Sequence, residues 1–194
     1  MRLKPHMVRP AAPTPSGDRD LVQRIRAGDA AAYEQLFRAY YGGLTGFAVR
    51  YLTDLSGAEE LVQGLFADLW TNRASLDVHS NVRSYLFSAV RNRALNVRRR
   101  ALIERDWDEG EDRADVEALQ WSPERPDLAL ERVEAHDRLR AAIERLPERC
   151  RLVMQLRWRD QLSYVEIAET MGISVKGVEN QLGRGLKALR EMLR

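Results

Sequence analysis

Four polar residues near the end of the chain have a spacing that would place them on one face of a helix. Asn180 and Arg184 are four residues apart, and Lys176 and Lys187 lie about one turn to either side. Arginine pairs with guanine O6 and N7 and asparagine with adenine N6 and N7, whereas lysine binds phosphates. This face is therefore predicted to bind the major groove of DNA, and a solvated basic surface is the alternative.

The residues around this face indicate two helices joined by a tight turn. Ser163 followed by Glu166 is a capping box, Gly172 suits a sharp turn, and Ser174 suits the start of the next helix. Apolar residues then recur at spacings of three and four, at Val175, Val178, Leu182, Leu186, Leu189 and Leu193. The pattern predicts a helix-turn-helix, with an ordinary helical hairpin as the alternative.

Charge is distributed unevenly along the chain, although the net charge is only +2. Residues 1–103 carry 15 basic and 9 acidic side chains, and residues 131–194 carry 13 and 10. Between them, residues 104–130 carry 3 basic and 10 acidic side chains. Two basic blocks around an acidic joint indicate two modules that face nucleic acid, or merely solvated surface.

Helical periodicity extends over most of the chain, and the alternation typical of strands is absent. We therefore predict an all-α fold: a disordered tail over residues 1–17, a helical domain over 18–103, an acidic flexible linker over 104–130 and a helix-turn-helix domain over 131–194. Helices are expected at 18–27, 30–52, 56–70, 80–100, 131–145, 147–158, 163–171 and 174–193.

Local signals set three of these helix boundaries. Gly28 and Asp29 favour a turn between the first two helices. Ser56 followed by Glu59 is a second capping box and predicts the start of the third helix. Pro147 suits the first position of a helix, because the N–H group that proline lacks would have no hydrogen-bond acceptor there.

Composition argues against an enzyme, a disulfide-linked protein and a membrane protein. The histidines His6, His79 and His136 are isolated, and no glycine-rich phosphate loop occurs, so neither catalysis nor a metal or other cofactor is expected. Cys150 is the only cysteine, which fits a reducing cytoplasm. No apolar run approaches the roughly 20 residues of a membrane span, and no signal peptide is expected.

Four stretches, taken in order, resemble the extracytoplasmic-function sigma factors of bacterial RNA polymerase. They are AYEQLFRAYYGGLTGFAVRY, GAEELVQGLFADLW, VRSYLFSAVRNRALNVRRR and LPERCRLVMQLRWRDQLSYVEIAETMGISVKGVENQL. The resemblance covers about residues 18–194. It implies a promoter-specificity subunit without catalysis of its own, in which residues 18–103 bind core polymerase and the −10 element and residues 131–194 bind the −35 element.

The resemblance also implies contact residues in the N-terminal domain. The helix at 56–70 would dock on the clamp helices of the largest polymerase subunit, through Glu60, Gln63, Phe66 and Trp70. Gly64 departs from the family, which often has an acidic residue there. The following segment and helix would bind the −10 element, with the non-template strand captured through His79, Ser80 and Asn81 and phosphates bound by Arg83, Arg91, Asn92, Arg98 and Arg99. For Arg98 and Arg99, a basic helix end is the alternative.

In the C-terminal domain the resemblance implies that the helix at 174–193 reads the −35 element. The candidate residues are Ser174, Lys176, Gly177, Glu179, Asn180, Gly183, Arg184 and Lys187. Glu179 matches a family contact position, although helical geometry places it nearer the core edge. Gly183 stands where other members carry a larger residue, and it would let the DNA approach the backbone.

The expected partners are core RNA polymerase and promoter DNA in double-stranded and single-stranded form, with an anti-sigma factor as a further candidate. A response-regulator activator is the alternative within DNA-binding proteins, because its output helices show similar GISVKxVENxL stretches. That class needs an α/β receiver domain, and residues 18–103 show no strand pattern. A helical adaptor without DNA binding is the remaining alternative.

Overall fold

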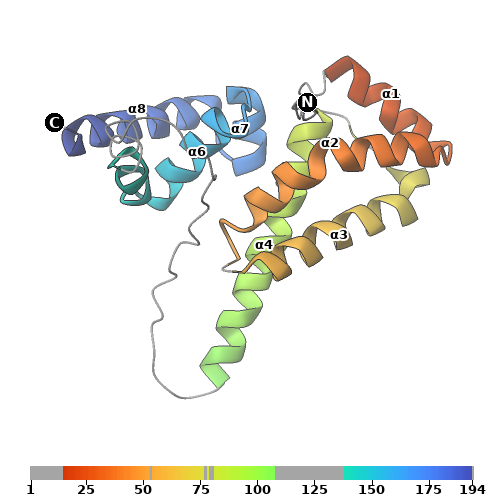
Figure 1. The fold of residues 1–194 in the computed structure, drawn as a ribbon, viewed down its shortest axis with the longest axis horizontal. Helices are drawn as coiled ribbons and strands as arrows, with labels where there is room; N and C mark the ends of the chain where they lie inside the picture. The colour runs from red at the N-terminus through yellow and green to blue at the C-terminus, as the bar shows by residue number, and fades with distance from the viewer. Residues whose placement is uncertain (1–14, 53, 77, 79–80, 108–137, 194) are drawn as a thin grey trace, which may run out of the picture.

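The computed structural model describes residues 15–52, 54–76, 78, 81–107 and 138–193 (Figure 1). This part of the chain contains helices and no strand, which confirms the all-α prediction. The described elements are α1 (Pro15–Arg26), α2 (Ala30–Ala48), α3 (Leu55–Thr71), the 3-10 turn η1 (Arg73–Ser75), α4 (Val82–Trp107), a helical segment at 138–144, α6 (Glu148–Trp158), α7 (Tyr164–Met171) and α8 (Val175–Met192).

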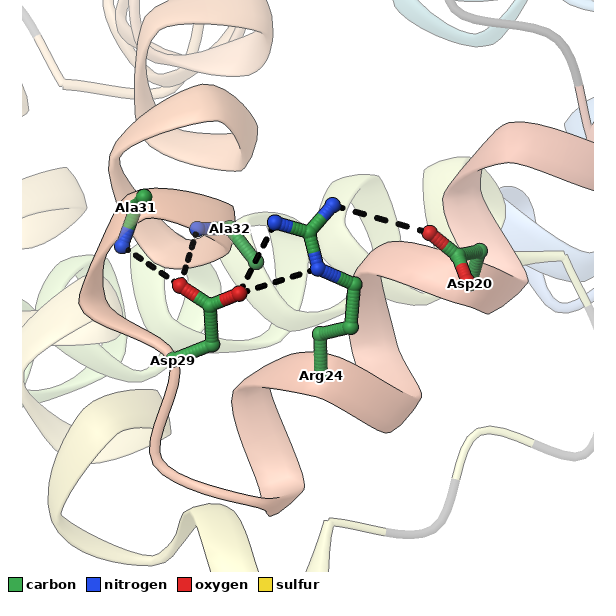
Figure 2. Close-up of polar contacts among 5 residues, drawn as sticks. All are labelled: Asp20, Arg24, Asp29, Ala31 and Ala32. Atoms are coloured by element: carbon green, nitrogen blue, oxygen red, sulfur yellow. Dashed lines mark hydrogen bonds and ion pairs between the residues drawn. The ribbon is translucent and has the colours of Figure 1, made fainter.

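The turn between α1 and α2 is fixed by one carboxylate (Figure 2). Asp29 caps α2 by accepting hydrogen bonds from the backbone N–H groups of Ala31 at 2.9 Å and Ala32 at 3.1 Å. Arg24 donates from Nε to the other carboxylate oxygen at 2.9 Å and also pairs with Asp20 at 3.7 Å. The N–H of Ala32 and the Arg24 guanidinium lower the pKa of Asp29. The turn predicted at this position is confirmed.

The N-terminal domain packs α2 against α3 and α4, with α1 across one end (Figure 1). Its core is aromatic as well as aliphatic. Phe66 on α3 lies 4.9 Å from the ring of Phe37 on α2, and Phe47 lies 5.1 Å from the ring of Phe87 on α4. Leu36, Leu44, Val62, Leu86 and Val90 complete the contact between the helices, each fully buried.

Several predicted boundaries shift. Helix α3 begins at Leu55 with Asp54 as its cap, so the proposed capping box at Ser56 is wrong; the Asp54 carboxylate accepts from the N–H of Gly57. Pro147 is the residue before α6 rather than its first residue. Helix α1 begins inside the predicted tail, α2 ends four residues early, and α4 extends to Trp107 inside the predicted linker. The tail and linker predictions for 1–14 and 108–130 lie outside the described residues.

The helix-turn-helix has the predicted caps and turn. Ser163 and Glu166 form both hydrogen bonds of the capping box, at 3.2 Å and 2.7 Å. Gly172 ends α7 in the left-handed conformation, with φ 63°, which a residue without a Cβ adopts at little cost. Ser174 then caps α8 by accepting from the N–H of Gly177 at 3.0 Å. Local sequence signals therefore determine where both helices begin and end.

The apolar stripe of α8 is only partly buried. Val178, Leu182 and Leu189 are buried, whereas Val175, Leu186 and Leu193 are 39–46% exposed. Gly185 is the position at which α8 lies against α6, because a Cβ there would lie 2.4 Å from Sδ of Met154 on α6. A small residue thus brings α6 and α8 together more closely than the leucine spacing suggested.

The two domains contact one another. Helix α7 packs against α4, and the turn before α7 reaches the end of α2 (Figure 1). The contacts include hydrogen bonds and ion pairs between residues about 50 to 110 positions apart, described below.

Candidate nucleic-acid and polymerase interfaces

One face of α8 is open to solvent and carries the predicted base-reading residues. Asn180, Arg184 and Lys187 are exposed and lie within an arc of about 60° at 100° per residue. The buried residues of α8 lie on the opposite side. At Gly183, which belongs to the same face, no atom lies within 4 Å of where a Cβ would be. The empty space beside the Gly183 backbone would let DNA approach it closely.

The other residues predicted for this surface shape the start of α8. The Ser174 hydroxyl is occupied as the helix cap, and a Cβ at Gly177 would lie 3.5 Å from the side chain of Ile173. Lys176 pairs with Glu179 at 2.9 Å. The side chain of Glu179 is 46% exposed, at the edge of the buried stripe. It sits between the buried stripe and the open face, where it can orient Lys176.

The start of α4 holds the described part of the predicted −10 site. Asn81 accepts from the N–H of Arg83 at 2.8 Å, and its amide nitrogen donates to Glu166 of α7 at 2.9 Å. Arg83 donates to the backbone carbonyls of Asp160 and Gln161. His79 and Ser80, predicted beside them, lie outside the described residues. The two described members therefore lie together, and both are engaged by the C-terminal domain.

The remaining predicted −10 residues divide between two sides of α4. Arg83, Arg91 and Arg98 follow one another at spacings of eight and seven, within an arc of about 80°. Arg98 pairs with Glu148 of α6 at 3.2 Å. Burial raises the pKa of the Tyr51 hydroxyl, and the charge of the neighbouring Arg91 lowers that pKa by a smaller amount.

Asn92 and Arg99 lie on the other side of α4. They line a shallow surface together with Leu95 and Asn96, whose side-chain oxygen accepts from Arg99 at 3.1 Å. The structure therefore does not gather all the predicted −10 residues on one surface.

Helix α3 presents part of the predicted polymerase-binding surface. Glu60 and Gln63 are exposed, and Gln63 donates to the Tyr41 hydroxyl at 3.3 Å. Trp70 is half-buried, with the Tyr33 ring at 4.9 Å and the Arg73 guanidinium over its own ring at 4.6 Å.

The prediction for Phe66 is corrected, because its side chain is 1% exposed and belongs to the core. At Gly64, a Cβ would lie 3.9 Å from the Arg93 guanidinium, so the position has room for a larger side chain.

The domain junction contains residues that the sequence did not indicate. Arg50 and Asp160 form an ion pair at 2.8 Å, with side chains only 8% and 7% exposed. Nearby, Asp18 accepts a 2.5 Å hydrogen bond from the Tyr40 hydroxyl, and burial raises the pKa of both groups. The pKa of Arg159 is lowered by desolvation and by Arg50. Periodicity gives no signal for such pairs, because their partners are distant in the sequence.

Two other kinds of site were sought in the described residues. Their histidine, cysteine and acidic side chains form no group of three or more that would hold a metal ion. Among the described helices, none combines the length and apolar character needed to cross a membrane.

Comparison with known proteins assigns both domains. The model of sigma-70 region 2 matches residues 36–102, and that of sigma-70 region 4 matches residues 136–189. The extracytoplasmic-function sigma factor SigW of Bacillus subtilis is 26% identical over 89% of this chain and 95% of its own length. RpoE of Cereibacter sphaeroides, of the same group, is 28% identical over 84% of this chain and 87% of its own.

A solved structure supports the fold. The sigma factor RpoE of Bartonella quintana, crystallised with the anti-sigma factor NepR, has a TM-score of 0.61 and 23% identity, covering 83% of this chain and 96% of that one. Two sigma-70 regions are matched in order, and the relatives extend over most of the chain. The chain belongs to the sigma-70 family, as an extracytoplasmic-function sigma factor.

Proposed function

We propose that this sigma factor divides promoter recognition between its two domains, with α8 reading the −35 duplex and the start of α4 binding the −10 strand. Promoter-specific initiation by RNA polymerase is the function of its family. The observation that carries the division is the open face of α8, where Asn180, Arg184 and Lys187 are exposed opposite a buried stripe. That arrangement is the one a recognition helix needs in a major groove.

The partners and place of action follow from this role. Core polymerase would be bound through α3, and no catalysis by the chain itself is required. Polymerase and genomic DNA are cytoplasmic in bacteria, so we place the protein there. The Bartonella quintana sigma factor was solved with an anti-sigma factor. We extend that kind of partner to this chain as part of the proposal.

Transcription from genomic DNA tests the proposed function. Core polymerase is supplied with the purified chain, and transcript starts are mapped by sequencing. A promoter class with a shared element near −35 and another near −10 is expected, absent when core polymerase is used alone. Starts identical to those of core polymerase alone would contradict the proposal.

The polymerase contact of α3 gives a separate prediction. Glu60 and Gln63 are exposed, so exchanging both for arginine changes charge on the surface and leaves the core intact. Co-purification with core polymerase is expected to fall at least about tenfold, since like charge placed across a polar contact costs on the order of a kcal/mol or more. The matched control is the double exchange of Glu34 and Gln35 for arginine, on the exposed surface of α2. Equal recovery of all three proteins would rule out this surface.

A further inference from the structure

Helix α8 carries a glutamine that belongs neither to its buried stripe nor to the predicted base-reading residues. Gln181 is half-buried and lies about 60° around the helix from Arg184, on the side that contacts α6. Together with Arg184 and Ala188 it lines a groove of about 430 Å³ between α8 and the start of α6, open to solvent. A ligand of the Arg184 guanidinium is therefore within reach of the Gln181 amide.

A thiol on α6 fixes the direction of this amide. Cys150 is buried, and its Sγ donates to Oε1 of Gln181 at 3.0 Å. The contact depends on the close approach of the two helices at Gly185, one turn further along α8, where a Cβ would lie 3.7 Å from Cβ of Cys150. The carbonyl end of the Gln181 amide is thus held against α6.

The nitrogen end of the amide remains available to a ligand. None of the hydrogen bonds within the described part of the chain uses Nε2 of Gln181. A free glutamine amide offers an acceptor and two donors, so it can bind adenine through both N6 and N7. With Oε1 turned toward the buried thiol, only N–H donors face the groove. The amide then suits a base edge that consists of acceptors.

The four bases differ in how well they match such a donor. In the major groove guanine presents the acceptors O6 and N7 and thymine presents O4, whereas cytosine presents only the N4 donor. We propose that Gln181 reads a second base of the −35 duplex beside the one read by Arg184, and that Cys150 is a positioning residue that makes this glutamine prefer guanine or thymine. This inference rests on the proposed function of α8.

Gln181→Ala in the full chain tests the contact. Anisotropy measures binding to the mapped −35 duplex and to duplexes changed at each −35 base pair. At one pair the parent is expected to prefer guanine or thymine over cytosine by at least about threefold, the effect of one hydrogen bond. Gln181→Ala should lose this preference and keep the one that depends on Arg184. Gln35→Ala, the same change on the exposed surface of α2, should match the parent.

Two substitutions at Cys150 test its positioning role. Cys150→Ala removes the donor and frees the amide to present its oxygen, so adenine should gain at least about threefold relative to guanine at the same pair. Cys150→Ser keeps a donor at this position and should retain the parent's order of bases. A general loosening of the domain would weaken binding to every duplex alike and would not favour adenine over guanine.

Gln181→Glu tests the same arrangement without changing a buried residue, and it decides the matter if Cys150→Ala does not fold. The carboxylate presents an acceptor to the groove, so the order at this pair should reverse in favour of cytosine, whose N4 group donates. The added negative charge should lower affinity for every duplex, but it does not change the order of the bases. An unchanged order would overturn the proposal.

The outcomes separate this contact from the proposed function. If Gln181→Ala keeps every base preference of the parent, or weakens binding to all duplexes alike, Gln181 does not read a base and the inference is overturned. A folded Cys150→Ala protein with the parent's order of bases, or a Cys150→Ser protein that matches Cys150→Ala, would overturn positioning by the thiol. A parent that binds all the duplexes equally would instead contradict the proposed function of α8.

Discussion

Replacing Phe66 by alanine is expected to lower the free energy of unfolding by about 3–5 kcal/mol, the range for deleting a buried aromatic ring. The Phe66 ring is 1% exposed and meets Phe37 edge-on at 4.9 Å. The Tyr33 hydroxyl donates to the Phe66 carbonyl at 3.1 Å and fixes α2 against α3 from the same site. Loss of the ring leaves a cavity that these rigid helices cannot fill.

Urea unfolding followed by circular dichroism measures this effect. Leu55→Ala is the control on the same helix, because its side chain is 56% exposed and its change should remain within about 0.5 kcal/mol. If the Phe66→Ala protein unfolds at the parent's urea concentration but no longer binds core polymerase, Phe66 contacts polymerase and is not needed for the core.

The helix-turn-helix was predictable because its determinants are local. Ser163, Glu166, Gly172 and Ser174 each act within four residues of their own position, through capping bonds or a left-handed turn. Their identities therefore determine the geometry whatever the rest of the chain does. The same holds for the turn at Asp29, whose partners are close in sequence.

Helix boundaries and contact faces were harder to predict where two residues of similar character compete. Asp54 and Ser56 are both good caps, and the structure uses Asp54 for α3. On α8, Leu186 fits the apolar spacing, yet it is 39% exposed because α6 approaches at the glycine one residue before it. Phe66 fits both a core and a partner surface, since periodicity does not tell which apolar residues face outward.

The contacts at the domain junction could not be predicted from the sequence for a different reason. Arg50 and Asp160 are separated by 110 residues and have no periodic relation to each other. Asn81 is predicted to bind DNA, whereas its contact with Glu166 depends on how the two domains meet. Long-range polar contacts of this kind follow from tertiary structure and leave no local pattern.

Replacing Arg184 by alanine is expected to cost about 1–3 kcal/mol of binding to the cognate −35 duplex and to relax preference at a single base pair. Arg184 is exposed on the open face of α8, in register with Asn180 one turn before it. Its planar guanidinium can form two parallel hydrogen bonds with guanine O6 and N7, which no other base presents in that pattern. The loss should therefore depend on sequence.

Two companion variants distinguish base reading from attraction to phosphate, with binding measured on the mapped duplex and on duplexes changed at each −35 position. Arg184→Lys keeps the charge but not the two-bond geometry, so it should lose most of the base preference while retaining the salt dependence. Lys187→Ala should weaken binding to every duplex alike and reduce the slope of log affinity against log salt by about one unit. If Arg184→Ala behaves as Lys187→Ala does, with equal loss on every duplex, Arg184 binds the backbone and another residue reads the base.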